Sequence, residues 1–284
     1  MNLSKAVSLA FPGDMWILLA VALILCAIGF YKYVYFLSIG YGWAIAGEGI
    51  VLLLLFRTTV TPVMVILCLL FVCYGARLSG FLIYREVKSA SYRKTLKTVT
   101  KTNKPMPFFV KCAIWIPVSL LYVAQITPVY YRLVNGREQD IVLPVAGAVI
   151  MCFGLLLETL ADQQKSKQKK ENPNMVATKG LYSFVRCPNY LGEILFWTGV
   201  FVSGCSIFSG GIQLIIALIG YVCIVMIMFN GAQRLEGRQN KSYGAKKEYQ
   251  DYVNATPILL PFIPLYHLSK QEKEEMVHEG EKKA

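Results

Sequence analysis

Three residues with reactive or charged side chains stand inside apolar segments. Glu48 lies in a glycine-rich apolar stretch that precedes a run of leucines, and Arg77 follows Tyr74 by three residues in the next apolar run. A charged side chain inside a membrane-spanning segment costs several kcal/mol, so it is by default a candidate functional residue. The simpler interpretation is a buried salt bridge, for example between Glu48 and Arg77.

A second group of polar residues gathers near the predicted ends of later apolar segments. Carboxylates can hold ribose hydroxyls or an amide, and arginines can hold phosphates. The group consists of Glu158, Asp162, Arg186, Asn189, Glu193, Arg234 and Arg238, followed by Tyr243, Tyr249 and Tyr252. Acids four residues apart share one helical face. The composition predicts a pocket for a polar, anionic ligand that enters from the cytosol, although the tyrosines would also suit a belt at the membrane interface.

Apolar segments must position these residues. Of 284 residues, 55% are hydrophobic and only 16% are charged, with a mean hydropathy of +0.48, whereas ordinary globular chains are about 25% charged. The apolar runs cover residues 14–36, 41–56, 60–84, 108–129, 141–161, 190–208 and 210–230. Each run is close to the roughly 20 residues that a spanning helix needs. We therefore predict an all-α polytopic transmembrane bundle of about seven spans, the first of them a retained helix.

The distribution of charge predicts the topology of this bundle. The net charge is +12, from 29 lysines and arginines against 17 acids, and the excess falls in residues 85–111, 165–186 and the segment after Asn230. The positive-inside rule puts these regions and the C-terminus in the cytosol, and seven spans then put the N-terminus outside. Topology accounts for the charge without nucleic-acid binding.

Several reaction classes lack the residues they need. The only histidines, His267 and His278, lie near the C-terminus, which argues against a metal or haem site in the membrane and against Ser-His-Asp or Cys-His catalysis. Seven of the eight cysteines lie in or beside apolar runs and none forms a CxxC pair, so we interpret them as buried apolar residues. Neither a GxGxxG nor a P-loop motif occurs.

The segment Gly180–Ile194, GLYSFVRCPNYLGEI, carries a recognisable pattern. It resembles the C-terminal domain of the steroid 5-alpha-reductase family and its bacterial relatives. Residues 158–165 look like the acidic helix end of that family, and residues 249–263 look like its C-terminal ending. The resemblance covers about residues 150–265.

The resemblance implies a seven-helix membrane reductase that binds NADPH from the cytosol. The cofactor pocket would be lined by Glu158, Asp162, Arg186, Asn189, Tyr190, Glu193, Arg234, Arg238, Tyr243 and Tyr252. By the same resemblance, Tyr74 and Glu48 would be the catalytic residues beside the substrate carbonyl. Tyr74 can donate its phenol proton to that oxygen. Glu48 can donate only when it carries a proton, the form that burial in an apolar span favours.

Cys187 departs from the pattern, because many bacterial relatives have histidine there. In the methyltransferases that share this C-terminal pattern, that histidine belongs to the S-adenosylmethionine site. A methyltransferase of a lipid or prenyl substrate therefore remains the alternative, weakened by Cys187. A transporter or lipid-binding protein is a third interpretation, which predicts two matching halves with broken helices.

These inferences define the expected organisation of the chain. Residues 1–265 would form one membrane-embedded domain, with substrate-side helices in residues 1–130, a cofactor-binding part in residues 141–265, and a polar tail at 266–284. The partners would be membrane lipids and a lipophilic substrate from the bilayer, with no metal and no nucleic acid. The membrane would be the plasma membrane of a bacterium or the endoplasmic reticulum of a eukaryote. A steroid, a polyprenyl chain and a fatty enoyl group all stay open as substrates, as does the oligomeric state.

Overall fold

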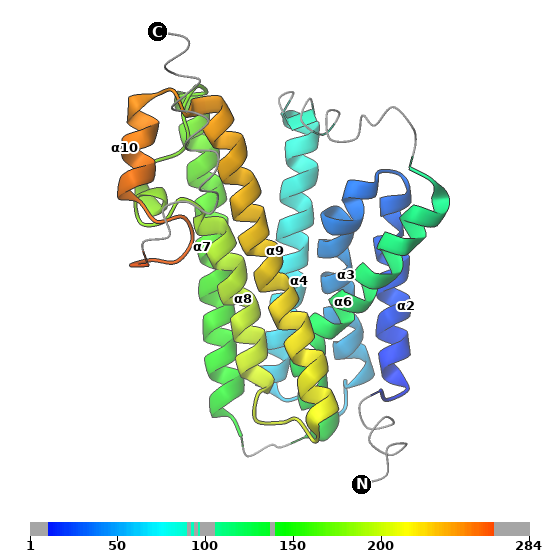
Figure 1. Cartoon of the computed structure of the whole chain (residues 1–284). Helices are drawn as coiled ribbons and strands as arrows, with labels where there is room; N and C mark the ends of the chain where they lie inside the picture. The colour runs from blue at the N-terminus through cyan, green and yellow to red at the C-terminus, as the bar shows by residue number, and fades with distance from the viewer. Residues whose placement is uncertain (1–10, 90–91, 94–95, 97–105, 137–139, 264–284) are drawn as a thin grey trace. The chain divides into compact units, whose positions relative to one another are not determined.

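The computed structural model describes residues 11–89, 92–93, 96, 106–136 and 140–263, and within these ranges all regular secondary structure is helical, without a strand (Figure 1). The helices long and apolar enough to cross a membrane are α4 (Pro62–Lys88), α6 (Phe108–Asn135), α7 (Val142–Glu171) and α9 (Gly211–Tyr243). The shorter α2 (Asp14–Cys26), α3 (Ile39–Leu55) and α8 (Pro188–Gly204) lie in the other predicted runs. The prediction of a helical membrane protein is thus confirmed. The predicted polar tail and both histidines lie outside the described residues.

The first apolar run is broken, contrary to the prediction of one helix through residue 36. Helix α2 ends at Cys26 and is followed by the 3-10 turns η1 (Ala27–Phe30) and η2 (Tyr33–Leu37). Polar contacts hold the segment that follows the break. Lys32 forms an ion pair with Glu86, and the Tyr35 hydroxyl donates to both oxygens of the same carboxylate, at 2.7 and 2.6 Å.

Helices α7 and α9 extend well past the apolar runs that predicted them. α7 continues to Glu171 and α9 to Tyr243, whereas the runs end at residues 161 and 230. Both extensions are rich in Lys, Gln and Arg, which are good helix formers. The extension of α7 meets no proline or glycine before Pro173, whereas α9 continues through Gly231 and Gly237 and ends just before Gly244. The charged residues of these two extensions, which the sequence analysis put beyond the spans, therefore lie on helices.

The chain divides into two compact units whose boundaries fall inside helices. Unit 1 comprises Met1–Val149 and Thr198–Cys223, and unit 2 comprises Ile150–Trp197 and Ile224–Ala284. The expected organisation into residues 1–130 and 141–265 concerns roles rather than contacts and stays a prediction. The two units are described separately.

In unit 1, α3 and α4 pack closely through glycines. A β-carbon added at Gly42 would meet the Gly75 carbonyl oxygen at 2.8 Å, and one added at Gly49 would meet the Cys68 carbonyl oxygen at 2.8 Å. Helix α6 crosses α2 and α3 obliquely (Figure 1) and contains Pro117 and Pro128. Pro128 removes the hydrogen bond to the carbonyl four residues earlier. The Thr127 hydroxyl donates to that Ala124 oxygen at 2.7 Å and replaces the lost bond.

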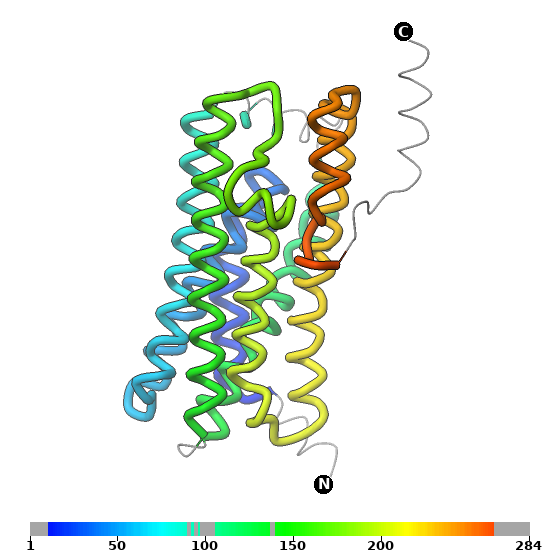
Figure 2. Tube along the Cα trace, turned by 90° about the vertical axis from the view of Figure 1, so that its left-hand side faces the viewer, coloured from blue at the N-terminus to red at the C-terminus, as the bar shows by residue number. Residues whose placement is uncertain are grey.

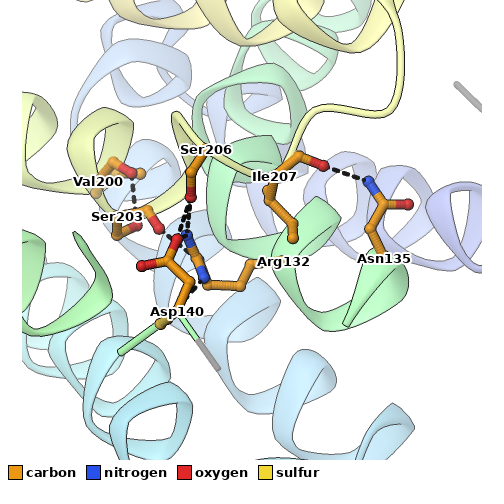
Figure 3. Close-up of polar contacts among 7 residues, drawn as sticks. All are labelled: Arg132, Asn135, Asp140, Val200, Ser203, Ser206 and Ile207. Atoms are coloured by element: carbon orange, nitrogen blue, oxygen red, sulfur yellow. Dashed lines mark hydrogen bonds and ion pairs between the residues drawn. The ribbon is translucent and has the colours of Figure 1, made fainter. Parts of the chain in front are cut away.

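Arg132, at the end of α6, organises a polar network in unit 1 (Figure 3). Its guanidinium donates to the Ser203 carbonyl oxygen at 2.5 Å, to a carboxylate oxygen of Asp140 at 3.0 Å and to the Ser206 hydroxyl at 2.7 Å. Ser206 in turn donates to the same Asp140 oxygen. Nearby, the Asn135 amide donates to the Ile207 carbonyl oxygen at 3.0 Å. The network joins the end of α6, the start of α7 and the α8–α9 connection.

The Asp140 carboxylate should make the stability of this network depend on pH. Its hydrogen bonds from Ser206 and Arg132 lower its pKa below the ordinary value of 3.8. Because the folded pKa is the lower one, the stabilisation is present above pH 4 and is lost as the pH falls below it. In detergent, we expect Asp140→Asn to lower the melting temperature by about 2–4 °C at neutral pH. The difference from wild type should shrink between pH 5 and pH 3. A difference that does not change over this range would contradict the assignment.

Unit 2 combines the C-terminal parts of α7 and α9 with the start of α8, the 3-10 turn η3 (Gly180–Ser183) and α10 (Lys247–Ala255). α7 and α8 touch at two glycines, since a β-carbon on Gly192 would lie 2.7 Å from the Gly154 carbonyl oxygen. After Gly244 the chain reverses, and α10 runs beside the end of α9 (Figure 2). The Tyr249 hydroxyl holds this return by donating to the Asn240 side chain at 2.6 Å.

Candidate functional site

Unit 2 contains a cavity of about 220 Å³ with a basic lining. Its walls come from α7, the loop after it, η3, α9 and α10. The lining residues are Lys165, Lys169, Val176, Ala177, Tyr182, Arg186, Leu235, Arg238, Gln239, Ser242, Tyr243 and Tyr252. Among the described residues that line it, four are cations, three are tyrosines and none is an Asp or Glu. A cavity of this composition suits an anionic ligand that also offers a flat or hydrogen-bonding surface.

Helical periodicity builds two walls of the cavity. Lys165 and Lys169 are four residues apart on α7, and Leu235, Arg238 and Ser242 follow one another at intervals of three and four on α9. Residues at this spacing share one face of a helix. The extension of both helices beyond the apolar runs is therefore what brings these side chains to the cavity.

Two glutamines fix the loop that closes a third wall. The Gln168 side-chain oxygen accepts from the backbone N–H groups of Thr178 and Lys179, at 2.9 and 3.0 Å. The Gln164 side-chain oxygen accepts from the N–H of Leu181 at 2.8 Å. Between them Gly180 has a φ of +70°, a conformation that L residues rarely adopt. The loop thus returns to α7 and presents Tyr182 to the cavity.

The four cations differ in how far their charge is compensated. Arg186 forms an ion pair with Glu236 at 2.9 Å, and both side chains are almost fully buried. Lys169 donates to two backbone carbonyls and to the Tyr243 hydroxyl, which are neutral acceptors. Arg238 is exposed, and in the described part of the chain no hydrogen bond or ion pair to it is formed. The cavity therefore retains net positive charge, to which Arg238 contributes most directly.

Burial keeps two tyrosines of the cavity wall and the nearby Cys187 in their neutral forms. Burial raises the pKa of the Tyr182 and Tyr252 phenols, and the Tyr252 hydroxyl donates to the Tyr182 carbonyl oxygen at 2.6 Å. Burial also raises the pKa of the Cys187 thiol to about 11. Cys187 is thus a protonated, weakly nucleophilic residue at neutral pH. Its N–H donates to the Ile258 carbonyl oxygen at 2.9 Å, which gives this position a structural role.

A group of hydrogen-bond acceptors lies where α7 packs on α8. Glu158 and Glu193 are 4% and 7% exposed, and Gly192 brings the two helices together beside Glu158. The side-chain oxygen of Asn189 is buried, and no described residue donates to it. A buried amide oxygen of this kind is usually satisfied by a partner. The position is suited to a ligand that donates hydrogen bonds through hydroxyl or amide groups.

The structure brings together part of the predicted cofactor set. Arg186, Arg238, Tyr243 and Tyr252 line the cavity. The others lie elsewhere in unit 2: Glu158, Asn189 and Glu193 at the α7–α8 contact, Tyr190 against Gly231, Asp162 near Tyr182, and Arg234 exposed on α9.

The sequence analysis missed Lys165, Lys169 and Tyr182 as site residues. The two lysines continue the spacing of Glu158 and Asp162 at intervals of three and four residues. This periodicity is a signal that could have identified them, had α7 been predicted to continue past residue 161. Tyr182 has no such signal, because the loop carries it back to α7.

The two predicted catalytic residues lie in unit 1, and both side chains are fully buried. The Tyr74 hydroxyl donates to the Tyr41 hydroxyl at 3.1 Å. The Tyr41 ring lies 4.8 Å from the ring of Tyr122. The sequence analysis singled out neither Tyr41 nor Tyr122.

Glu48 lies on the same face of α3 as Tyr41, seven residues along. No described residue forms a hydrogen bond with either of its carboxyl oxygens. The salt bridge with Arg77, which was the simpler interpretation, is therefore wrong. The carboxyl does not hydrogen-bond to Tyr74 either, so their joint action stays a prediction.

The fold and the cavity together define a helical membrane protein with a basic, tyrosine-lined pocket. A model of the family described as "Protein of unknown function (DUF1295)" matches residues 38–256, and the chain belongs to this family. No curated protein and no solved structure matches the chain. Within the described residues, no group of three or more His, Cys, Asp or Glu side chains could hold a metal ion.

Proposed function

We propose that the protein is an integral-membrane, NADPH-dependent reductase of a carbonyl-conjugated C=C bond in a lipophilic substrate. A 4-ene-3-oxo steroid is the first substrate to test. The resemblance of residues 150–265 to the steroid 5-alpha-reductases motivates the proposal. The observation that carries it is the basic cavity of unit 2, whose described lining has four cations and no acid.

The charge of the cavity discriminates between the two candidate cofactors. NADPH carries a diphosphate and a 2′-phosphate, for which lysine and arginine are the usual protein partners. S-adenosylmethionine carries no phosphate and has a sulfonium cation, which the net positive charge of the cavity would repel. Since the volume of about 220 Å³ is below the roughly 300–1,000 Å³ of typical ligand pockets, the cavity would take only a phosphate-bearing part of NADPH.

The residues of unit 2 would divide the binding of NADPH between them. Lys165, Lys169 and Arg238 would hold phosphate oxygens, and Tyr243 would cover the ligand beside them. Asn189, Glu158 and Glu193 would accept hydrogen bonds from hydroxyl or amide groups, which the buried amide oxygen of Asn189 supports. When bound, NADPH would supply the hydride.

The buried polar residues of unit 1 would act on the substrate. Addition of a hydride to the far carbon of the enone places negative charge on the carbonyl oxygen, and a donor aimed at that oxygen lowers the barrier. Tyr74 would donate its proton there instead of to Tyr41. Glu48, fully buried and without a hydrogen-bond partner among the described residues, is suited to remain protonated and to act as a second donor.

We further propose seven spans, formed by α2, α3, α4, α6, α7, α8 and α9, with the C-terminus in the cytosol and the N-terminus outside. The basic segments between and after these helices support this orientation through the positive-inside rule. The substrate would enter from the bilayer. The membrane would be the plasma membrane of a bacterium or the endoplasmic reticulum of a eukaryote.

The proposal is tested by a titration of the detergent-purified protein with NADPH and, separately, with S-adenosylmethionine. We expect saturable binding of NADPH only, followed by NADPH oxidation that depends on an added 4-ene-3-oxo steroid. Binding without oxidation would retain the cofactor assignment and exclude this steroid class as substrate. Binding of S-adenosylmethionine alone would overturn the proposal in favour of a methyltransferase.

A further inference from the structure

The turn Leu260–Ile263, at the end of the described chain, presents two apolar side chains to the surroundings. Phe262 is 99% exposed and Ile263 is 47% exposed. Phe262 also has a φ of 65°, and it is the one described residue other than glycine with a positive φ. For a bulky residue this backbone conformation is unfavourable, and it persists only where the surrounding structure imposes it.

The base of the turn is firmly held. The N–H groups of Arg186 and Cys187 donate to the carbonyl oxygens of Pro257 and Ile258, each at 2.9 Å. The side chains of Ile258 and Leu259 are buried, at 1% and 0% exposed. The exposure of Phe262 therefore does not result from a frayed chain end. A structured segment holds an aromatic ring outward.

Within unit 2, the turn lies at the level where the apolar surface of α7 gives way to charge. The Ile258 carbonyl oxygen accepts a hydrogen bond from the N–H of Cys187, which directly precedes α8. The first turns of α8 contact α7 near Gly154 and Glu158. In this part of α7, Phe153, Leu156 and Leu160 are exposed by 60%, 61% and 48%, while the charged residues Asp162 and Lys165 follow within the next five positions. Figure 2 shows residues 256–263 beside the start of α8.

We propose that Phe262 and Ile263 insert into the interfacial layer of the bilayer that surrounds α7, and that the partner of this surface is lipid. Along the axis of α7, the turn lies at about the same position as the exposed apolar residues of this candidate membrane-spanning helix. Apolar and aromatic side chains at this depth gain by leaving water for the boundary between headgroups and acyl chains. The contact tethers the segment 256–258, which holds Arg186 in the cavity wall, to the membrane surface. The inference does not depend on the proposed reaction.

Tryptophan fluorescence in proteoliposomes tests the contact. Phe262→Trp places an indole in the turn, and Glu248→Trp places one at an exposed position in the first turn of α10 as a matched control. The signal of the four native tryptophans is subtracted with the unsubstituted protein. In vesicles of brominated phosphatidylcholine, we expect quenching of the added indole at position 262 to be at least about twofold stronger than at position 248. Acrylamide, a quencher dissolved in the water, should quench the indole at position 248 more strongly than the indole at position 262.

Three results would count against the proposal. Equal quenching of both indoles by acrylamide would mean that position 262 lies in water. Protection from both quenchers would mean that protein, from this chain or another copy, covers the turn. If Phe262→Trp lowers the melting temperature, the same quenching measurement is made on Ile263→Trp. An indole at position 263 that brominated lipid does not quench would overturn the inference. Phe262→Gly, which tolerates the positive φ, should melt no lower than wild type in detergent.

Discussion

Replacement of Tyr74 by phenylalanine should lower the turnover of a 4-ene-3-oxo substrate by about 100-fold or more and leave NADPH affinity unchanged. The substitution removes one oxygen from a fully buried side chain, whose hydroxyl donates to the Tyr41 hydroxyl at 3.1 Å. The ring and its packing remain. A loss confined to turnover would then report the proton that stabilises the developing enolate. The measurement is steady-state NADPH oxidation, paired with an equilibrium titration of NADPH.

Tyr122→Phe is the matched control for this prediction. Tyr122 is also buried in unit 1, but its hydroxyl donates to the backbone oxygen of Phe36 at 2.8 Å, which is a structural role. Loss of such a bond lowers stability by about 1 kcal/mol and should change turnover little. Unchanged turnover in Tyr74→Phe would remove Tyr74 from the mechanism. Equal losses in both variants would show that the effect is one of packing.

Charge reversal at Arg238 should weaken NADPH binding by about 100-fold. A charge-assisted hydrogen bond contributes about 1.5–3 kcal/mol, and a factor of ten in affinity corresponds to 1.4 kcal/mol. Arg238→Glu removes one such contact and adds repulsion to the phosphates. Because Arg238 is exposed, and the described chain gives it no ion pair, the variant should fold normally. The measurement is a fluorescence titration with NADPH at low salt.

Lys241→Glu provides the control, since Lys241 is an exposed cation three residues further along α9 that does not line the cavity. It changes the net charge of the protein by the same amount and should alter affinity only slightly. Raising the salt concentration should reduce the difference between wild type and Arg238→Glu, because ions screen exposed charges. Equal weakening in both variants would mean that NADPH responds to the net charge of the surface rather than to this cavity.

The helical membrane architecture could be predicted because it depends on local properties of the chain. A spanning segment must satisfy its own backbone hydrogen bonds in lipid, so a run of about 20 apolar residues is itself evidence of a helix. The run 108–129 accordingly lies within α6, and all but the first two residues of the run 60–84 lie within α4. The ends of helices were less predictable. α2 stops at Cys26, and the segment beyond it is held by Lys32 and Tyr35, which pair with Glu86 on a different helix.

The candidate site was predicted only in part for the same reason. Arg186, Arg238, Tyr243 and Tyr252 could be chosen from residue type and from the resemblance, and they share one cavity. Tyr182 could not, because it reaches the cavity only through a loop that Gln164 and Gln168 tie back to α7.

Taken alone, the sequence determined the helical class, the approximate place of each apolar segment and the kinds of side chain available for anion binding, since each depends on composition and spacing. The tertiary structure alone decided which charges are neutralised. Arg186 is compensated by Glu236, while Arg238 keeps its charge. It also decided that Glu48 is buried apart from Arg77, and that Phe262 points outward on a left-handed backbone. These outcomes depend on contacts between residues that are distant in sequence. Local composition and spacing do not show which of these residues meet.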